Sequence, residues 1–316
     1  MSQNKETSGI KRKTALAAVI VGSVLFLFTF LFVQGVRKQL WEQSINTIME
    51  STRQGCSTLK VQLRKNFESM DTVAGYAEGF TKEQKKELGR LIENYSDIED
   101  SVYLYLSDGT CIPEASQKDK GVEDALKNID KDSGILDPHI SSATGVNVFD
   151  LFVRTELKDG TTGYLIKQYE VESIVDSFSL SFYNNAGFSY VVNTKGNVLI
   201  RSPHPNSNKT VQNLFDMLPL NRNEEAGITS FRQSLKELRT GWAVFYYQGE
   251  DTVFSYTPLK LDTDWYLISI IPKRVVNAQT NVILMRSMAL IVSILAGIFL
   301  LVAFYLYYVN KVNKRL

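Results

Sequence analysis

Two long uncharged apolar runs, one near each end of the chain, limit most strongly what this sequence can fold into. The first covers residues 14–33 and the second residues 287–309 of the 316-residue chain. At a rise of about 1.5 Å per residue, a helix of either length reaches about 30 Å, the thickness of the hydrocarbon core of a bilayer. Neither run carries the polar stripe of a soluble surface helix. The sequence therefore predicts two transmembrane helices.

The first run has an alternative interpretation as a cleaved secretory signal. Lys11, Arg12 and Lys13 precede it as a basic n-region would. However, the run is longer than the apolar part of a signal, and no small-residue cleavage site follows it. We therefore favour an uncleaved anchor.

Basic residues flank the outer ends of both runs. They are Lys5, Lys11, Arg12 and Lys13 before the first run, and Lys311, Lys314 and Arg315 after the second. By the positive-inside rule, residues 1–13 and 310–316 should lie in the cytoplasm and residues 34–286 outside it. The expected location is the plasma membrane, crossed twice, with the lipid bilayer as a partner of both runs.

Charge and composition argue against several classes of protein. A formal net charge of +1 offers no basic surface for nucleic acid. Cys56 and Cys111 are too few for a disulfide scaffold or a thiolate metal site, and they could form one bridge or remain two thiols. His139 and His204 are isolated in the sequence, so neither a metal site nor a cofactor is expected.

Motifs of the common enzyme classes are absent from the sequence. It contains no G-x-S-x-G, no HExxH and no phosphate-binding glycine loop. We therefore expect no catalytic residues and no catalysis by this chain.

Residues 34–75 are expected to form one long helix that continues from the first membrane span. The stretch lacks proline, and its apolar residues recur at helical spacing. They are Leu40, Ile45, Ile48, Leu59, Leu63, Phe67, Met70 and Val73. A helix of this length, about 60 Å, exceeds what one compact domain needs, which predicts an interface between the protomers of a homodimer. The alternative is a pair of helices broken at Gly55.

The pattern then changes to alternating strands around polar insertions. After a surface helix at 81–91, strands are predicted at 100–106, 146–157 and 164–171, and residues 111–145 are predicted to be loop with a short helix near 122–129. Five further strands, at 188–192, 198–201, 241–248, 252–258 and 265–271, surround a partly helical insertion at 202–238. Strand, strand, insertion and three strands is the order of a PAS-like antiparallel sheet. We therefore predict an α+β fold with a membrane-distal module at 76–178, a membrane-proximal module at 179–275 and a helical connector at 276–286.

Two segments of the second module carry a family resemblance. FSYVVNTKGNVLIRS at 188–202 is similar to the opening hairpin of double Cache sensors, and TPLKLDTDWYLISIIP at 257–272 to their closing strand. The chain therefore resembles the extracytoplasmic double Cache region of bacterial transmembrane receptors, most closely that of membrane diguanylate cyclases. The resemblance implies that the distal module recognises a ligand and that the proximal module couples ligand binding to a cytoplasmic output domain or partner protein. Such an output would be a diguanylate cyclase, a histidine kinase or a chemotaxis signalling domain, and no sequence motif of these domains occurs in this chain.

Candidate ligand-binding residues lie on the predicted distal strands. They are Tyr103, Tyr105, Asp150, Arg154 and Gln168. Asp150 and Arg154 alternate onto one face of the strand at 146–157. If this face lines a pocket, Arg154 would bind a ligand carboxylate and Asp150 an amine; the alternative is that Asp150 and Arg154 lie on a solvated face.

The resemblance also bears on the identity of the ligand. Amino-acid-binding members of the family have an aspartate at about the position of Gln168 and an Arg-x-Trp-Tyr stretch that this chain lacks. We therefore expect a small polar or carboxylated metabolite rather than an α-amino acid. The alternative function is a membrane-anchored assembly protein that binds another protein.

Overall fold

The computed structural model describes residues 3–95, 100–114, 119–127, 129–178 and 186–313. The chain divides into two compact units. One comprises Met1–Asn46 with Arg274–Leu316, and the other is Thr47–Lys273. The second unit holds all the strands of the described chain, so the fold is α+β as predicted.

Two helices are long and apolar enough to cross a membrane. They are α1 (Gln3–Ala77) and α6 (Lys273–Asn313). The candidate spans lie within Ile20–Ala77 and Lys273–Tyr305, where the most apolar windows have mean hydropathies of 1.9 and 2.7 and are not buried. These segments overlap the apolar runs predicted to span the membrane.

The long helix expected at 34–75 is continuous in the structure. It forms the second half of α1, and the helix does not break at Gly55. The connector expected at 276–286 is also helical, because α6 begins at Lys273, directly after the last strand.

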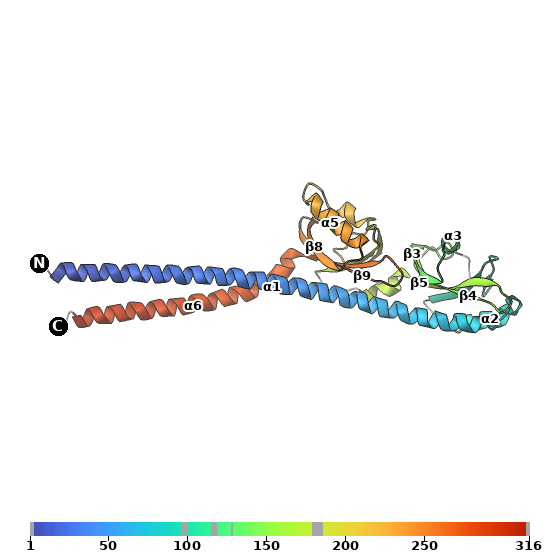
Figure 1. The fold of residues 1–316 in the computed structure, drawn as a ribbon, viewed down its shortest axis with the longest axis horizontal. Coiled ribbons are helices and arrows are strands. Elements are labelled where there is room, and N and C mark those ends of the chain that lie inside the picture. The colour runs from blue at the N-terminus through green and yellow to red at the C-terminus, as the bar shows by residue number, and fades with distance from the viewer. Residues whose placement is uncertain (1–2, 96–99, 115–118, 128, 179–185, 314–316) are drawn as a thin grey trace. The chain divides into compact units, whose positions relative to one another are not determined.

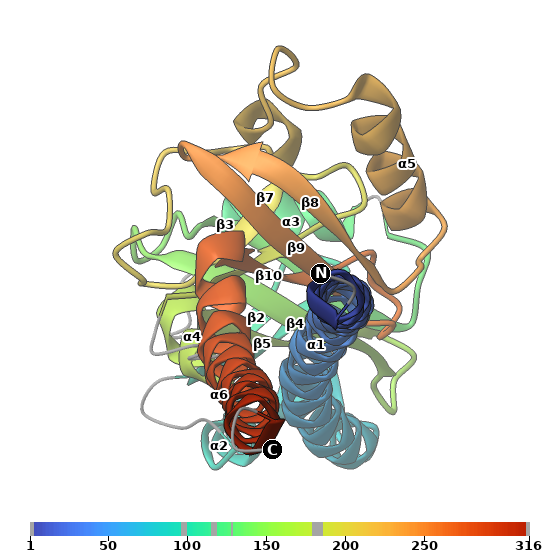
Figure 2. The ribbon, with the colours of Figure 1, turned by 90° about the vertical axis from the view of Figure 1, so that its left-hand side faces the viewer.

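The distal module is a five-stranded antiparallel sheet in the order β2-β1-β5-β4-β3. Its strands are β1 (Asp100–Leu106), β2 (Cys111–Ile112), β3 (Ser133–Ile140), β4 (Asn147–Glu156) and β5 (Thr162–Glu170). Its helical segments are η1 (Lys82–Gln84), α2 (Lys85–Glu93), α3 (Lys120–Leu126) and α4 (Val171–Phe178). Figure 1 labels α2 and α3, and Figure 2 labels α4. The loop predicted at 111–145 is wrong in part, because it contains β2 and β3. Polar residues and a proline in these short edge strands hide the alternation that marks a strand.

The proximal module repeats this plan, with the sheet order β7-β6-β10-β9-β8. Its strands are β6 (Phe188–Val192), β7 (Val198–Arg201), β8 (Gly241–Tyr247), β9 (Glu250–Pro258) and β10 (Tyr266–Pro272), and its helices are η2 (Leu214–Met217) and α5 (Glu225–Lys236). Phe231 of α5 packs on Phe254 and Tyr256, so this helix covers one face of the sheet (Figure 2). The matching strand order confirms two tandem PAS-like sheets.

The two modules share a continuous apolar core along α1. Leu59 and Leu63 of α1 cluster with Leu104 and Leu165 of the distal sheet and with Trp265 at the start of β10. Burial of such side chains stabilises the fold by about 1.5–3 kcal/mol each. One face of the distal sheet therefore packs on α1, and the opposite face remains for other contacts.

No disulfide joins the two cysteines. Cys56 lies in α1 with its Sγ 3.5 Å from the Pro258 carbonyl, and Cys111 is buried on β2. Burial raises the pKa of the Cys56 thiol to about 11, although Lys60 opposes the shift. The alternative of one bridge between them is therefore not observed.

Candidate functional site

All the predicted site residues lie on one face of the distal sheet, opposite the face that packs on α1. The central strand β5 pairs with β4 on one side and with β1 on the other. Gln168 of β5 pairs with Asp150 of β4. Ile166 of β5 lies between Tyr103 and Phe152, and Tyr164 of β5 lies between Tyr105 and Arg154. Leu151 and Val153 alternate with these residues and join the core along α1. The pairing of the strands thus brings these side chains to a common face.

Burial separates the predicted residues into two groups. Asp150 and Tyr103 are buried, with 0% and 3% of their surface exposed, while Gln168 and Tyr105 are half-buried. Arg154 keeps 54% of its side chain exposed and pairs with Asp132 at 3.5 Å. The solvated-face interpretation therefore holds for Arg154 but not for Asp150.

Arg154 is also too far along its strand to share a small ligand with Asp150. The two residues are four positions apart on β4, which corresponds to about 13 Å along an extended strand. The structure therefore does not bring Arg154 together with the other predicted residues.

A bulge in β3 brings His139 to the same face as Asp150. Leu136 pairs with Asp150, but Val148 pairs with His139 rather than Pro138, so β3 contains one extra residue. An extra residue reverses the alternation of side chains beyond it. His139, which is isolated in the sequence, therefore faces Asp150 in the structure.

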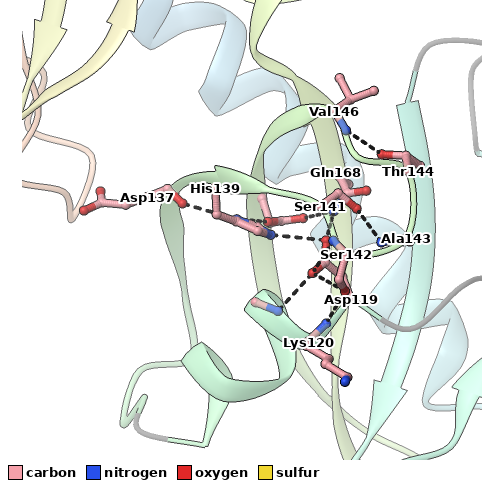
Figure 3. A network of polar contacts seen from close by, with 12 residues as sticks. Asp119, Lys120, Asp137, His139, Ser141, Ser142, Ala143, Thr144, Val146 and Gln168 are labelled. Carbon is pink, nitrogen blue, oxygen red and sulfur yellow. Dashed lines mark hydrogen bonds and ion pairs between the residues drawn. The ribbon is translucent and has the colours of Figure 1, made fainter. Parts of the chain in front are cut away.

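His139 lies between two carboxylates. Its Nε2 is 3.2 Å from Asp119 Oδ2, and its Nδ1 is 3.6 Å from Asp150 Oδ2. The Gln168 amide donates to Asp150 Oδ1 at 3.0 Å and to Asp119 Oδ2 at 3.4 Å. Figure 3 shows Asp119, His139 and Gln168 converging from α3, β3 and β5. These four side chains, Asp119, His139, Asp150 and Gln168, are called the distal polar cluster below.

Asp119 reaches the cluster from the N-cap of α3. Its Oδ1 accepts hydrogen bonds from the Gly121 N–H at 2.9 Å and from the Ser142 hydroxyl at 3.2 Å. A Cβ at Gly121 would lie 2.5 Å from His139 Cδ2, closer than atoms can approach. Glycine at this position therefore allows α3 to approach the histidine.

The two carboxylates have opposite pKa shifts. Burial raises the pKa of Asp150 to about 6, although His139 and the Gln168 hydrogen bond oppose the shift. Burial acts in the same direction on Asp119, but hydrogen bonds from Ser141, the Gly121 N–H and His139 outweigh it and lower the pKa to about 2. Asp119 is therefore ionised at neutral pH, whereas burial disfavours the ionised form of Asp150.

Two buried polar atoms of this region have no hydrogen-bond partner within the described chain. They are Asp150 Oδ2 and the Tyr103 hydroxyl. The 3.6 Å from His139 Nδ1 to Asp150 Oδ2 is too long for a hydrogen bond. Burial, and then the charges of Asp150 and Asp119, raise the pKa of Tyr103, which keeps its phenol protonated. Most buried polar groups in proteins are hydrogen-bonded, so these two atoms are exceptions that a donor from outside the chain could satisfy.

Apolar side chains flank the distal polar cluster on the same face. They are Val122 and Leu126 of α3, Leu136 of β3, Phe152 of β4 and Ile166 of β5. A few directed polar groups beside an apolar wall are typical of small-molecule sites. Within the described part of the chain, no group of three His, Cys, Asp or Glu side chains could hold a metal ion.

The family model described as Cache domain matches residues 34–280. The chain belongs to the Cache domain family. It is a Cache-domain sensor, flanked by two candidate membrane helices. No curated protein matches its sequence significantly.

Solved structures similar to this Cache domain are ligand-binding domains of bacterial chemoreceptors. The domain of Pseudomonas aeruginosa PctB in complex with L-Arg is 17% identical, with a TM-score of 0.54 over 74% of this chain and 97% of that chain. The PctC domain of the same organism with GABA is 16% identical, with a TM-score of 0.54 over 72% and 98%. Pseudomonas fluorescens CtaA with L-isoleucine is 13% identical, with a TM-score of 0.56 over 77% and 98%. At these identities the likeness establishes the fold alone.

Sequence reasoning missed Asp119 and His139 as members of the cluster. Asp119 precedes the helix predicted at 122–129, and aspartate is a favoured N-cap residue, so this signal was present. For His139 the available signal was Pro138, because proline within a strand is confined to edges and bulges. The distal polar cluster of this Cache domain thus forms where the N-cap of α3 meets the bulge of β3.

Proposed function

We propose that this Cache domain is the extracytoplasmic sensor of a membrane receptor, and that its distal module binds a small polar molecule at the distal polar cluster. The observation that carries the proposal is the pair of buried, unpartnered atoms, Asp150 Oδ2 and the Tyr103 hydroxyl. An unsatisfied buried polar group costs about 1–3 kcal/mol, and a bound ligand would remove this cost. The complexes of similar domains with L-Arg, GABA and L-isoleucine support a ligand of this size.

A protein-binding assembly role receives less support from the same face. A protein partner would be favoured if the distal face held only packed apolar side chains. Instead, two buried carboxyl groups and a phenol lie among the apolar residues there, which fits a small polar ligand better.

The proposed topology places both termini in the cytoplasm, because basic residues flank the outer ends of both candidate spans. Ligand binding would then control a cytoplasmic output, such as cyclic-di-GMP synthesis, a histidine kinase or a chemotaxis domain. This chain would perform no catalysis itself. A reporter that requires the cytoplasm, fused after Leu316, should be active; activity only of a reporter that requires export would overturn the topology.

A thermal-shift screen of the full chain in detergent tests the sensor function. The panel should contain amines, amino acids, carboxylates, purines and sugars. A ligand at 100 times its Kd should raise the melting temperature by roughly 5 °C or more, because it binds only the folded state. The proposal fails if no member of the panel stabilises the chain.

A further inference from the structure

We propose that this Cache domain also senses pH, because His139 and Asp150 form a pair that takes up protons as the surroundings become acidic, and that β3 transmits the change to Trp265. This inference goes beyond the proposed function, since the signal is a proton rather than a small molecule. It requires no ligand.

Both ring nitrogens of His139 face hydrogen-bond acceptors. Nε2 lies 3.2 Å from Asp119 Oδ2, and Nδ1 lies 3.6 Å from Asp150 Oδ2 and 3.5 Å from the carbonyl oxygen of Asp137. A neutral imidazole carries one N–H, so one of its nitrogens would direct a lone pair at an oxygen. A protonated imidazole carries two N–H groups. A donor on each side of the ring is therefore present only after protonation.

The two carboxyl groups around the ring are shielded from water, whereas the ring is partly accessible. The side chains of Asp119 and Asp150 are 1% and 0% exposed, and that of His139 is 21% exposed. A buried carboxylate is unfavourable unless a cation or hydrogen-bond donors compensate it. Within the described chain Asp150 accepts one hydrogen bond, from Gln168, and its Oδ2 accepts none. Proton uptake by the pair, through the accessible imidazole, therefore removes an uncompensated charge.

The charged side chains of α3 leave this pair to itself, apart from the N-cap Asp119. Hydrogen bonds lower the pKa of Asp119 to about 2, so its charge is constant in mild acid. Lys120 is exposed, and Figure 3 shows its amine directed away from His139. Glu123 pairs with Lys127 at 3.6 Å. Asp119 thus supplies a fixed negative charge that favours a protonated ring.

The charged and titratable side chains of the strands are engaged elsewhere or do not change charge. Arg154 of β4 pairs with Asp132, and Lys167 of β5 donates to Asn66 on the opposite face of the sheet. Burial, and then the charges of Asp150 and Asp119, raise the pKa of Tyr103 on β1, so its phenol stays protonated. Among the residues described around the ring, the His139–Asp150 pair is therefore the group that titrates in mild acid.

A change at His139 acts on both α3 and β3. A Cβ at Gly121 would lie 2.5 Å from His139 Cδ2, so α3 packs directly against the ring. On β3, Pro138 separates His139 from Asp137, whose Oδ1 accepts the indole N–H of Trp265 at 2.8 Å. Proline has a fixed φ, so little of a displacement is absorbed between the two residues. Trp265 is therefore where the proximal module should register the proton.

The fluorescence of Trp265 in the full chain in nanodiscs tests the proposal. The other two tryptophans are removed by Trp41→Phe and Trp242→Phe, so that Trp265 alone emits. As the pH falls from about 8 to about 4.5, its emission should change in a transition with a midpoint near 6, the pKa to which burial raises Asp150.

Substitutions in the pair should move this midpoint in opposite directions. His139→Gln removes a charge that lowers the pKa of Asp150, so the midpoint should rise by about one pH unit. Asp150→Asn removes an anion beside His139, so the midpoint should fall by about one unit. The double variant should show no transition near pH 6. If Asp150→Asn does not fold by circular dichroism, His139→Gln alone retains the test, because Asp150 still ionises in it.

His204→Gln and Glu156→Gln are the matched controls. His204 is the other histidine of the chain, and glutamine keeps an acceptor for the Asn206 N–H that bonds to its ring. Glu156 is an exposed carboxylate at the end of β4, the strand of Asp150. Both variants should leave the midpoint unchanged.

Three results would overturn the proposal. The first is an emission that stays constant over this range in the chain with Trp265 alone. The second is a transition that the double variant leaves unshifted, since Asp137 beside Trp265 would then be the group that titrates. The third is a midpoint that moves in His204→Gln and not in the variants of the pair. The thermal-shift panel tests small-molecule binding separately, so either the sensor function or the response to pH can fail without the other.

Discussion

Asp150 and Asp119 contact the same histidine, yet their pKa values move in opposite directions. Asp119 accepts hydrogen bonds from several donors at the start of α3, which favour its ionised form. Asp150 accepts one hydrogen bond, from Gln168, and burial in an apolar setting dominates. Two neighbouring carboxylates therefore differ because of the donors around them, and Asp150 retains an acceptor for a ligand.

A pH-dependent stability follows from Asp150. Its pKa is raised from 3.8 to about 6 in the folded chain, so its contribution to stability is fully present below about pH 4 and is lost as the pH rises through about 6. Asp119 acts in the opposite direction, because its pKa of about 2 adds stability above about pH 4 that is lost on further acidification. Between pH 4 and 7 the effect of Asp150 should therefore dominate.

Asp150→Asn isolates this effect. The free energy of unfolding of the variant, minus that of wild type, should be about 2–3 kcal/mol higher at pH 7.5 than at pH 4, because the amide does not ionise. Thermal unfolding in detergent at the two pH values measures the difference. An equal effect of the substitution at both pH values would contradict the assignment.

Two glycines should respond differently to alanine. At Gly121 a Cβ would lie 2.5 Å from the His139 ring, whereas at Gly89 in α2 the nearest atoms, of Pro113, are 3.6 Å away. Gly89→Ala should stabilise the chain by about 0.5–1 kcal/mol through helix propensity. Gly121→Ala should destabilise it by about 1–3 kcal/mol, since His139 must move. Melting temperatures that shift equally for both variants would show that the approach of α3 to His139 is not tight.

At the scale of elements, β3 connects the distal polar cluster to the last strand of the proximal module. Trp265, at the start of β10, donates its indole N–H to Asp137 Oδ1 at 2.8 Å, and Asp137 precedes His139 by two residues on β3. Trp265 also packs edge-on against Phe149 of β4, with ring centroids 5.8 Å apart. A movement of β3 on ligand binding would therefore act directly on the start of β10.

Trp265→Phe should weaken this connection. We expect a loss of about 1–2 kcal/mol, because the substitution removes a hydrogen bond to a carboxylate and part of a buried ring. Trp242→Phe on β8, where the side chain is 42% exposed, is the control and should change stability by less than about 0.5 kcal/mol. Ligand affinity should remain near wild type in both variants, and the response of a complete receptor should fall in Trp265→Phe alone.

At the scale of the whole molecule, apolar residues of α1 that were expected to face a second protomer pack into the domain core instead. Leu59, Leu63 and Met70 are buried within the domain core, so they do not form a free stripe for a second copy. Val61 and Tyr76 are the large apolar residues that remain exposed on the described part of α1 between residues 47 and 77. The homodimer stays a prediction, and its interface along α1 would be mainly polar.

The transition from β10 to α6 predicts tight mechanical coupling. Pro272 ends β10 and Lys273 begins α6, so no loop separates the sensor from the candidate membrane span. Insertion of four glycines after Lys273 should preserve ligand affinity and abolish the response of a receptor that carries its output domain, because flexible residues absorb a displacement. An unchanged response in a cellular signalling assay would show that the connection is passive.

Local patterns determined much of this protein from the sequence by itself. Long apolar runs predicted the candidate spans, and the alternation in 188–192, 198–201 and 252–258 predicted strands that the structure contains. These signals are readable because side chains repeat every two residues in a strand and about every 3.6 in a helix. The same alternation placed Asp150 and Arg154 on one face of their strand, and the strand register then brought Tyr103 and Gln168 to that face.

Only the tertiary structure decided which of these side chains form a site. His139 faces Asp150 because of a bulge in an edge strand, and Asp119 joins them because α3 packs against β3 at Gly121. Asp150 is buried and Arg154 exposed on the same face of the same strand, and periodicity assigns both the same environment. The burial of a side chain depends on which segments cover its position in the sheet, and these segments are far apart in the sequence.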